Sequence, residues 1–320
     1  MTKSRVTIGI PCFNAGDTIG RAIESALLQD WPNLEILIVD DCSTDNSVDV
    51  IQSYVNDQAP HVKLIQHHQN QGPAGSRNTV LQSAAGEFIA FFDDDDESLP
   101  HRIRNQLETL LQYEKNSGVN LIACYAGGLR KYPNGYTLEL PAIGSHGESP
   151  PHGQRLAEYL LLYRREPNWF YGSGIPTCAL FARTTTFAAV NGFDDNLRRV
   201  EDADFAIRLS LIGGHFIGTS ESLFVQYSTN APDKSYEKNL AAEQLIARKH
   251  RIFLESINRY YYALHWPRLR YWHFKRQYGQ FMTELLGLLL RYPLPIAKHI
   301  LATGPKRLLH ERRMSREASP

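Results

Sequence analysis

The chain has 320 residues, and its 34 Lys and Arg balance its 34 Asp and Glu, so the formal net charge is zero. This length suits one domain of roughly 230 residues plus an appendage. No apolar run reaches the roughly 18 residues of a membrane-spanning helix, and the four cysteines lack paired or metal-type spacing, which excludes a membrane-spanning protein and a disulfide scaffold. We therefore expect free thiols, a cytoplasmic location and, because the first strand is predicted to begin at residue 6, no signal peptide.

The N-terminal part alternates predicted strands with predicted helices. Strands are predicted at 6–11, 34–39, 62–65 and 88–92, and helices at 19–27, at 48–55 and after Pro73. Further along, a helix is predicted at 99–113, a strand at 120–126, a long loop at 144–153 and a helix from residue 201. Strands this apolar, separated by helices, indicate an α/β fold with a mainly parallel central sheet covered by helices.

Polar and acidic residues follow the predicted strands. Pro11, Asp41, Gly72 and the run Asp93 to Asp96 all fall beyond carboxyl ends, where ligands bind in open parallel sheets. Four adjacent carboxylates repel one another, so we expect a cation beside them, and oxygen ligands on a short loop suit Mg²⁺ or Mn²⁺. The alternative is a solvated acidic turn that caps the next helix.

Seven segments together resemble one known family. They are 10–14 (IPCFN), 39–45 (VDDCSTD), 70–72 (NQG), 77–78 (RN), 86–96 (GEFIAFFDDDD), 192–194 (GFD) and 201–202 (ED). In this order they resemble the inverting glycosyltransferases of family 2, which have the GT-A fold. The resemblance runs from about residue 6 to about residue 227. Two positions depart from the pattern: Cys42 stands where the family often has Gly, and Asp94 occupies the variable middle position of the acidic motif.

The resemblance implies a domain organisation and an activity. It implies a catalytic domain over 1–235, with a nucleotide-sugar half at about 1–117 and an acceptor half at about 118–235. The composition of the remaining segment, 236–320, predicts a C-terminal helical extension. The resemblance implies metal-dependent transfer, with Mn²⁺ or Mg²⁺, from a nucleotide diphosphate donor, a UDP-sugar above all. The acceptor would be a glycan or glycolipid in surface polysaccharide assembly.

The resemblance also assigns residues to the donor and the metal. The donor residues are Pro11, Asn14, Asp41, Gly72, Arg77, Asp93 and Asp94. Asp41 would accept the imide N–H of uracil, although capping the helix after Ser43 is the alternative. Arg77 offers a planar fork of donors, although a solvated helix arginine is the alternative. Asp93 and Asp95 are the expected metal ligands, with Asp96 orienting them.

The acceptor side includes the general base. The family pattern places the base at Asp202, which would lie in the first turn of a helix, and Glu201 is its main rival. The aromatic segment 168–174 offers Trp169 and Tyr171 as rings for the apolar face of a sugar, although core packing explains such rings equally well.

The C-terminal segment is basic. Residues 241–320 contain 15 Lys or Arg and 5 Asp or Glu, a net +10, interleaved with aromatic residues and leucines. This composition suits a helix lying on an anionic membrane, here the inner face of the cell membrane, and equally a packed helical subdomain. Nucleic-acid binding is a weaker interpretation of the same charge.

Two other functions remain open at this stage. A nucleotidyltransferase also combines an α/β sheet, a metal and a nucleotide, but the loop between Pro11 and Arg21 lacks the expected glycine-rich, lysine-bearing sequence. A non-catalytic nucleotide-binding or glycan-binding module would be expected to lose either the metal carboxylates or the base, and this chain retains candidates for both.

Overall fold

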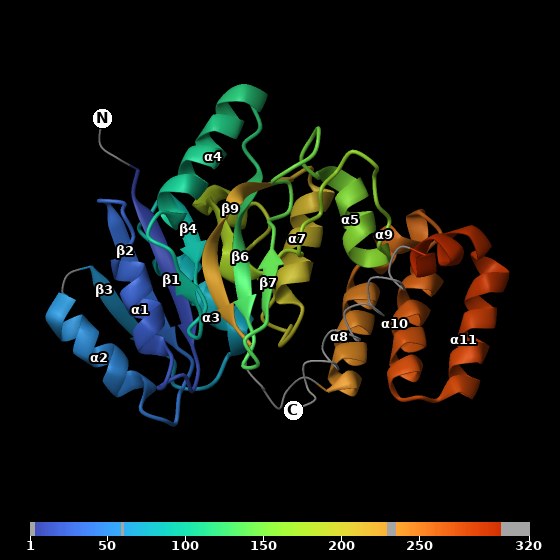
Figure 1. The fold of residues 1–320 in the computed structure, drawn as a ribbon, viewed down its shortest axis with the longest axis horizontal. Helices are drawn as coiled ribbons and strands as arrows, with labels where there is room; N and C mark the ends of the chain where they lie inside the picture. The colour runs from blue at the N-terminus through green and yellow to red at the C-terminus, as the bar shows by residue number, and fades with distance from the viewer. Residues whose placement is uncertain (1–3, 59–60, 229–234, 302–320) are drawn as a thin grey trace. The chain divides into compact units, whose positions relative to one another are not determined.

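The computed structural model describes residues 4–58, 61–228 and 235–301. They divide into two compact units (Figure 1). The first contains the residues up to 157 together with 165–228, and the second contains 158–164 together with the residues beyond 228. The predicted division of the catalytic domain into donor and acceptor halves stays a prediction.

The first unit begins with the predicted alternation of strands and helices. In chain order the elements are β1 (Val6–Cys12), α1 (Ile19–Leu27), β2 (Leu34–Asp40), α2 (Ser47–Gln58), β3 (Val62–Gln66), α3 (Gly72–Ser83) and β4 (Phe88–Phe91). The four strands pair in the order β3-β2-β1-β4, and every pair is parallel. The carboxyl ends of these strands therefore lie at one edge of the sheet, as the sequence predicts.

The remaining elements of this unit extend the sheet. They are β5 (Glu97–Ser98), α4 (Arg102–Ser117), β6 (Ile122–Lys131), β7 (Thr137–Leu140), the 3₁₀ helix η1 (Thr177–Ala179), β8 (Leu180–Arg183), α6 (Thr184–Ala188), α7 (Glu201–Leu211) and β9 (His215–Tyr227). The helix α5 (Gly153–Leu162) begins in this unit and ends in the second. The sheet continues from β4 through β8, β6 and β9 to β5, with β7 on the side of β6. Because β5, β7 and β8 run antiparallel to the other six strands, the sheet is mixed but mostly parallel.

Two glycines explain why β6 is longer than predicted. The sequence predicts this strand at 120–126, whereas β6 continues through Gly127 and Gly128 to Lys131. In the structure both pair with β9, where the register shifts. A Cβ atom on Gly128 would lie 2.4 Å from the ring of Phe224, and one on Gly127 would lie 2.5 Å from the carbonyl oxygen of Glu221. These glycines permit a close approach of two strands and do not end one.

Helices cover both faces of the sheet (Figure 1). The larger core joins one face of the strands to α1, α2 and α4, through side chains such as Ile8, Ile23 and Leu107. On the other face α3 packs against β1 and β2, and a Cβ atom on Gly9 would lie 2.4 Å from Val80. Phe91 of β4 makes edge-on ring contacts with Phe187 of α6 on this face. Burial on both faces explains why the strands are so uniformly apolar.

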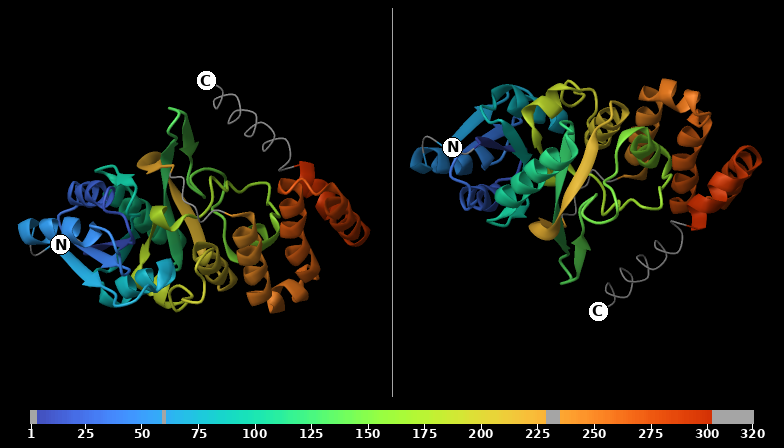
Figure 2. Two further views of the ribbon diagram at one scale, coloured as in Figure 1. Left: turned by 90° about the horizontal axis from the view of Figure 1, so that it is seen from below. Right: turned by 90° about the horizontal axis from the view of Figure 1, so that it is seen from above.

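The second unit is helical, as predicted for the C-terminal segment. It contains α8 (Tyr236–Lys249), α9 (Arg251–Ser256), α10 (Tyr260–Phe274) and α11 (Tyr278–Arg291), and it has a core of its own that includes Leu254, Tyr262 and Leu288. The helices α10 and α11 lie side by side and are joined by a short turn (Figure 2). Within the described ranges, no helix has the length and apolar character that crossing a membrane requires. Residues 302–320 of the predicted basic tail lie outside the described residues.

Candidate functional site

The loops after β1 and β2 hold each other at the carboxyl edge of the sheet. Asn14, in a left-handed conformation with φ 51°, donates its backbone N–H to Ser43 Oγ over 2.9 Å. Its side-chain oxygen accepts from the N–H of Thr44 over 2.8 Å. Cys42 has φ 66°, which explains why glycine often stands at this position in the resembled family. Asn14 therefore joins the two loops. Pro11 lies near the carboxyl end of β1, just before the first of them.

Asp41 is buried and organises the start of α3. Its carboxylate accepts the backbone N–H groups of Gln71 and Gly72, over 2.8 and 2.7 Å, and lies 2.7 Å from His67 Nδ1. The turn at Ser43 is instead capped by Asp40, so capping there is not the role of Asp41. A carboxylate has about four lone-pair sites, so these three contacts leave room for one more donor. The contact with a uracil base stays a prediction.

The acidic run lies directly beyond β4. Asp94 accepts the backbone N–H of Phe13 over 3.0 Å, which ties the run to the loop after β1. Burial, with the charges of Asp93 and Asp95 added, raises the pKa of Asp94 to about 7. The pKa values of Asp93 and Asp96 are also raised, mainly by burial and further by Asp95. Burial and mutual repulsion therefore disfavour full ionisation of the cluster, and the protein groups around it do not offset this.

This cluster fits a hard divalent cation. Carboxylate oxygens of Asp93 and Asp96 and the sulfur of Cys178 all lie within 4.8 Å of one another. Asp96 Oδ2 is buried and has no hydrogen-bond partner among the described residues, so it has an acceptor to spare. Burial raises the pKa of the Cys178 thiol well above its ordinary value, so the oxygens and not the sulfur are the suitable ligands.

Sequence reasoning gave no site role to Cys178, because it precedes a strand that was not predicted. The fully buried guanidinium of Arg102 positions Cys178 beside the acidic run. The guanidinium donates to the backbone carbonyl of Phe91 over 2.9 Å and to the backbone carbonyl of Cys178 over 2.6 Å. The sequence predicts Asp93 and Asp95 as the metal ligands. The group that the structure brings together shares Asp93 with that pair but contains Asp96 and Cys178 in place of Asp95. The backbone carbonyl of Asp95 accepts from the guanidinium of Arg21.

Arg77 connects the acidic run to α7. It is buried in α3, its Nη1 donates to Glu201 Oε1, and its Nη2 lies 3.8 Å from Asp93 Oδ1. Burial opposes its charge, but the carboxylates of Glu201 and Asp93 outweigh burial and raise the pKa of Arg77. The alternative of a solvated helix arginine is therefore wrong. Nε of Arg77 is buried without a hydrogen-bond partner among the described residues, so this side chain retains a donor.

Asp202 lies in the first turn of α7 beside this ion pair. Val200 precedes the helix with φ 60°, and Asp202 Oδ1 accepts the backbone N–H of Ala203 over 2.7 Å. Burial, with the neighbouring charge of Glu201 added, raises the pKa of Asp202 to about 6. Glu201 is engaged by Arg77, whereas Asp202 is a carboxyl whose proton affinity is tuned close to neutral pH.

A second arginine lies over the start of α3. Arg198 Nη1 donates to Asn70 Oδ1 over 2.6 Å, and a Cβ atom on Gly72 would lie 2.7 Å from the same guanidinium. Gly72 also has φ 80°, so both its conformation and its space favour glycine. The sequence marked Asn70 and Gly72 but not Arg198, because no local pattern shows that residues 128 positions apart meet.

The two aromatic residues predicted for the acceptor differ in accessibility. Trp169 is half-buried, and its indole N–H donates to Ser149 Oγ over 3.1 Å. Tyr171 is buried, and its hydroxyl accepts the backbone N–H of Glu166 over 2.8 Å. Of the two rings, Trp169 therefore retains more surface for a sugar.

A comparison with protein families identifies the chain. The family model described as Glycosyl transferase family 2 matches residues 7–184, which is more than half of the chain. The chain belongs to glycosyl transferase family 2. The resemblance seen in the sequence is thereby confirmed, and the match favours glycosyl transfer over the nucleotidyltransferase alternative.

Curated relatives in family 2 match part of the chain. The UDP-Glc:alpha-D-GlcNAc-diphosphoundecaprenol beta-1,3-glucosyltransferase WfaP of Escherichia coli is 40% identical over 102 residues, which are 32% of this chain and 39% of that protein. For the first three relatives found, the matched region is 35%, 29% and 43% of the relative's own length. The chain thus spans less than half the length of each of these relatives.

Solved structures share the fold of the chain. S. aureus TarS 1–349, in complex with UDP-GlcNAc, has a TM-score of 0.59 at 20% identity, covering 88% of this chain and 79% of that chain. The mannosyltransferase PcManGT from Pyrobaculum calidifontis, in complex with GDP-Man and Mn²⁺, has a TM-score of 0.54 at 16% identity, covering 99% and 84%. These similarities confirm the predicted GT-A-like fold.

Proposed function

We propose that the chain is a metal-dependent, inverting glycosyltransferase that moves a sugar from a UDP-sugar to a glycan or lipid-linked acceptor in surface polysaccharide synthesis. One observation carries the proposal: Arg77 joins the acidic run through Asp93 to the carboxylates at the start of α7 through Glu201. Groups suited to a diphosphate and a group suited to deprotonating an acceptor thus belong to one connected site. The name of WfaP and the UDP-GlcNAc complex of TarS support a UDP-linked donor, and the name of WfaP supports a polyprenyl-linked acceptor.

Donor binding would use the loops at the carboxyl edge of the sheet. Pro11, Asn14 and Asp41 would line the base and ribose, and Gly72 would keep the start of α3 open beside them. Arg77, with Asp93 and Asp94, would lie at the diphosphate, where a planar guanidinium matches phosphate oxygens. The remaining buried N–H of Arg77 would stabilise the negative charge that grows on the leaving diphosphate.

Asp93 and Asp95 would hold the metal, and Asp96 would support it with its unpaired oxygen. When bound, Mn²⁺ or Mg²⁺ supplies positive charge that neutralises the diphosphate leaving group. The structural relative that contains Mn²⁺ supports this choice of ion. The raised pKa values of Asp93 and Asp96 agree with a cluster that a cation would complete.

Asp202 would act as the general base. Its carboxylate would accept the proton of the acceptor hydroxyl while that oxygen forms a bond to the anomeric carbon and the bond from that carbon to the diphosphate breaks. Attack from the face opposite the leaving group inverts the anomeric configuration. Glu201 would hold Arg77 in place and would not take the proton. Trp169 would provide a ring for the acceptor sugar, with Tyr171 packed beneath it.

The metal assignment is tested with a panel of nucleotide sugars. We expect the chain to hydrolyse one of these nucleotide sugars only when Mn²⁺ or Mg²⁺ is present. Asp95→Asn should abolish this hydrolysis and weaken UDP binding without unfolding the protein. Asp49→Asn, an exposed carboxylate on α2, is the matched control and should retain activity. Full activity of Asp95→Asn in chelator-treated buffer would contradict the assignment.

A further inference from the structure

Helix α11 exposes apolar side chains on the face opposite the core. Its inner face packs into the core of the second unit through Leu288, which is fully buried, with Phe281 and Leu285 beside it. Its outer face carries a row of large apolar residues spaced four apart, and the row continues past the end of the helix. This outer stripe consists of Met282, Leu286, Leu290 and Leu294. Leu290 is 85% exposed, so α11 is apolar on both sides, which is unusual for a helix that only covers a core.

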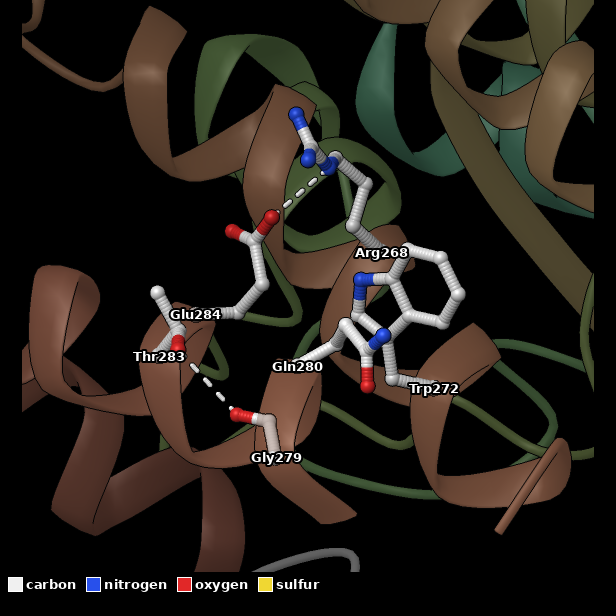
Figure 3. A pocket seen from close by; sticks show the side chains of 6 residues that line it. All are labelled: Arg268, Trp272, Gly279, Gln280, Thr283 and Glu284. Carbon is white, nitrogen blue, oxygen red and sulfur yellow. Dashed lines mark hydrogen bonds and ion pairs between the residues drawn. The ribbon is translucent and has the colours of Figure 1, made fainter. Parts of the chain in front are cut away.

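Acidic residues are scarce along the segment that carries the stripe. Residues 278–301 contain a single acidic residue, Glu284. Its carboxylate turns toward α10, where it lies 2.7 Å from His265 Nδ1 and 2.7 Å from Arg268 Nε (Figure 3). Exposed cations stand before and after the stripe, Arg276 ahead of α11 and Lys298 beyond Leu294. Arg291, the last residue of α11, lies instead over the ring of Tyr261 of α10, 3.9 Å from its centroid. The outer stripe is thus flanked by exposed cations, and the carboxylate of α11 faces α10 and not the stripe.

We propose that the outer stripe of α11 docks on the surface of an anionic lipid bilayer. Apolar side chains would enter the boundary between headgroups and acyl chains, while Arg276 and Lys298 would meet lipid phosphates. At 14 residues α11 is about 21 Å long by the rise of an α-helix, which is shorter than a bilayer core, so it lies along the surface and does not cross it.

The same charges disfavour a second copy of the chain as the occupant. A two-fold interface would place each stripe against itself and would bring the cations of one copy toward those of the other, with no carboxylate on this face to offset them. An anionic lipid surface offers the complementary charge without that repulsion. The inference goes beyond the proposed transfer reaction and does not depend on it.

A hollow between α10 and α11 adjoins the stripe. It measures about 410 Å³ and is lined by Arg268, Trp272, Gly279, Gln280, Thr283 and Glu284 (Figure 3). Gly279 and Thr283 lie three positions before Met282 and Leu286, so they neighbour the stripe on the helix surface. Tryptophan favours the headgroup depth of a membrane, because its ring is apolar and its N–H is polar. Trp272 would therefore lie at the edge of the docked surface.

The experiment measures binding of the full chain to vesicles of phosphatidylcholine, with and without phosphatidylserine, by sedimentation. We expect the chain to bind the anionic vesicles, and we expect this binding to weaken as the salt concentration is raised. The double substitution Leu286→Ser and Leu290→Ser should lower the partition coefficient at least about tenfold, because it removes apolar surface that would enter the bilayer. Both side chains are exposed, so far-UV circular dichroism and the thermal midpoint should not change.

The matched control is Leu28→Ser with Leu111→Ser, two exposed leucines of the first unit. It should sediment with vesicles like the parent chain. Three results would overturn the proposal: equal binding to neutral and anionic vesicles, an equal loss in the control variant, or no vesicle binding together with a dimer in analytical ultracentrifugation that the α11 substitutions dissociate. The last result would assign the stripe to a second copy of the chain.

Discussion

Removing the proposed base should separate transfer from donor binding. Asp202→Asn keeps the shape of the side chain and its contact with the N–H of Ala203 but cannot accept a proton. We expect donor and metal affinity to remain and sugar transfer to fall by roughly 10²-fold to 10⁴-fold, the range for loss of general-base assistance. The assay measures transfer at saturating donor and acceptor, with calorimetry for donor affinity.

The pH dependence of transfer follows from the raised pKa of Asp202. With a pKa of about 6, the carboxyl is roughly 90% ionised at pH 7 and roughly 10% ionised at pH 5 by the ordinary titration relation. Only the ionised form accepts a proton, so the rate constant of transfer should fall about tenfold between pH 7 and pH 5 if proton acceptance limits it. Calorimetry at both pH values shows whether donor binding contributes to the fall.

Glu201→Gln distinguishes the two carboxylates. The negative charge of Glu201 is one cause of the raised pKa of Asp202, so removing it should move the acid limb of the profile to lower pH while activity persists. If Glu201→Gln is inactive and Asp202→Asn transfers sugar at the parent rate, the roles are reversed. If neither substitution lowers transfer, the reasoning fails and another carboxylate is the base.

Two predictions concern the stability of the first unit. Glu35 is buried in β2 and accepts hydrogen bonds from Ala85, Lys63 and Thr7. Burial raises the pKa of Glu35, but these hydrogen bonds outweigh burial and lower it overall. The ionised carboxylate therefore stabilises the fold above the unfolded pKa of 4.5, and this stabilisation is lost as the pH falls through the lower pKa of the folded state. Glu35→Gln should cost about 2 kcal/mol in urea unfolding at pH 7, and an undiminished pH dependence below 4.5 in that variant would contradict the assignment. Cys42→Gly should raise the free energy of unfolding by up to about 1 kcal/mol, because glycine removes the strain of a left-handed conformation but also increases the entropy of the unfolded chain. Cys42→Ala is the control, since alanine keeps the strain of φ 66° and removes only the thiol. Equal stabilisation by alanine would show that the thiol, and not the backbone conformation, is the cause.

The sequence by itself determined the N-terminal architecture and the edge of the sheet where the site lies. Apolar strands such as 34–39, which end in charged residues, specify a parallel sheet covered on both faces, because only burial on both faces explains their uniform composition. Strand ends of parallel neighbours must share an edge, so Asp41 and the acidic run could be placed together before any contact was known. The helix face at 19–27 was equally readable, since its periodicity is local.

Only the tertiary structure decided which side chains meet in the site. Arg77 pairs with Glu201, 124 residues away, and Cys178 lies beside Asp93 because a buried arginine holds two distant carbonyls. The antiparallel β8, inserted between β4 and β6, was not predicted, because four residues carry too little periodic signal and its position depends on neighbours far along the chain. Local patterns report local conformation, whereas long-range pairing depends on packing free energy summed over the whole fold, which no short segment encodes.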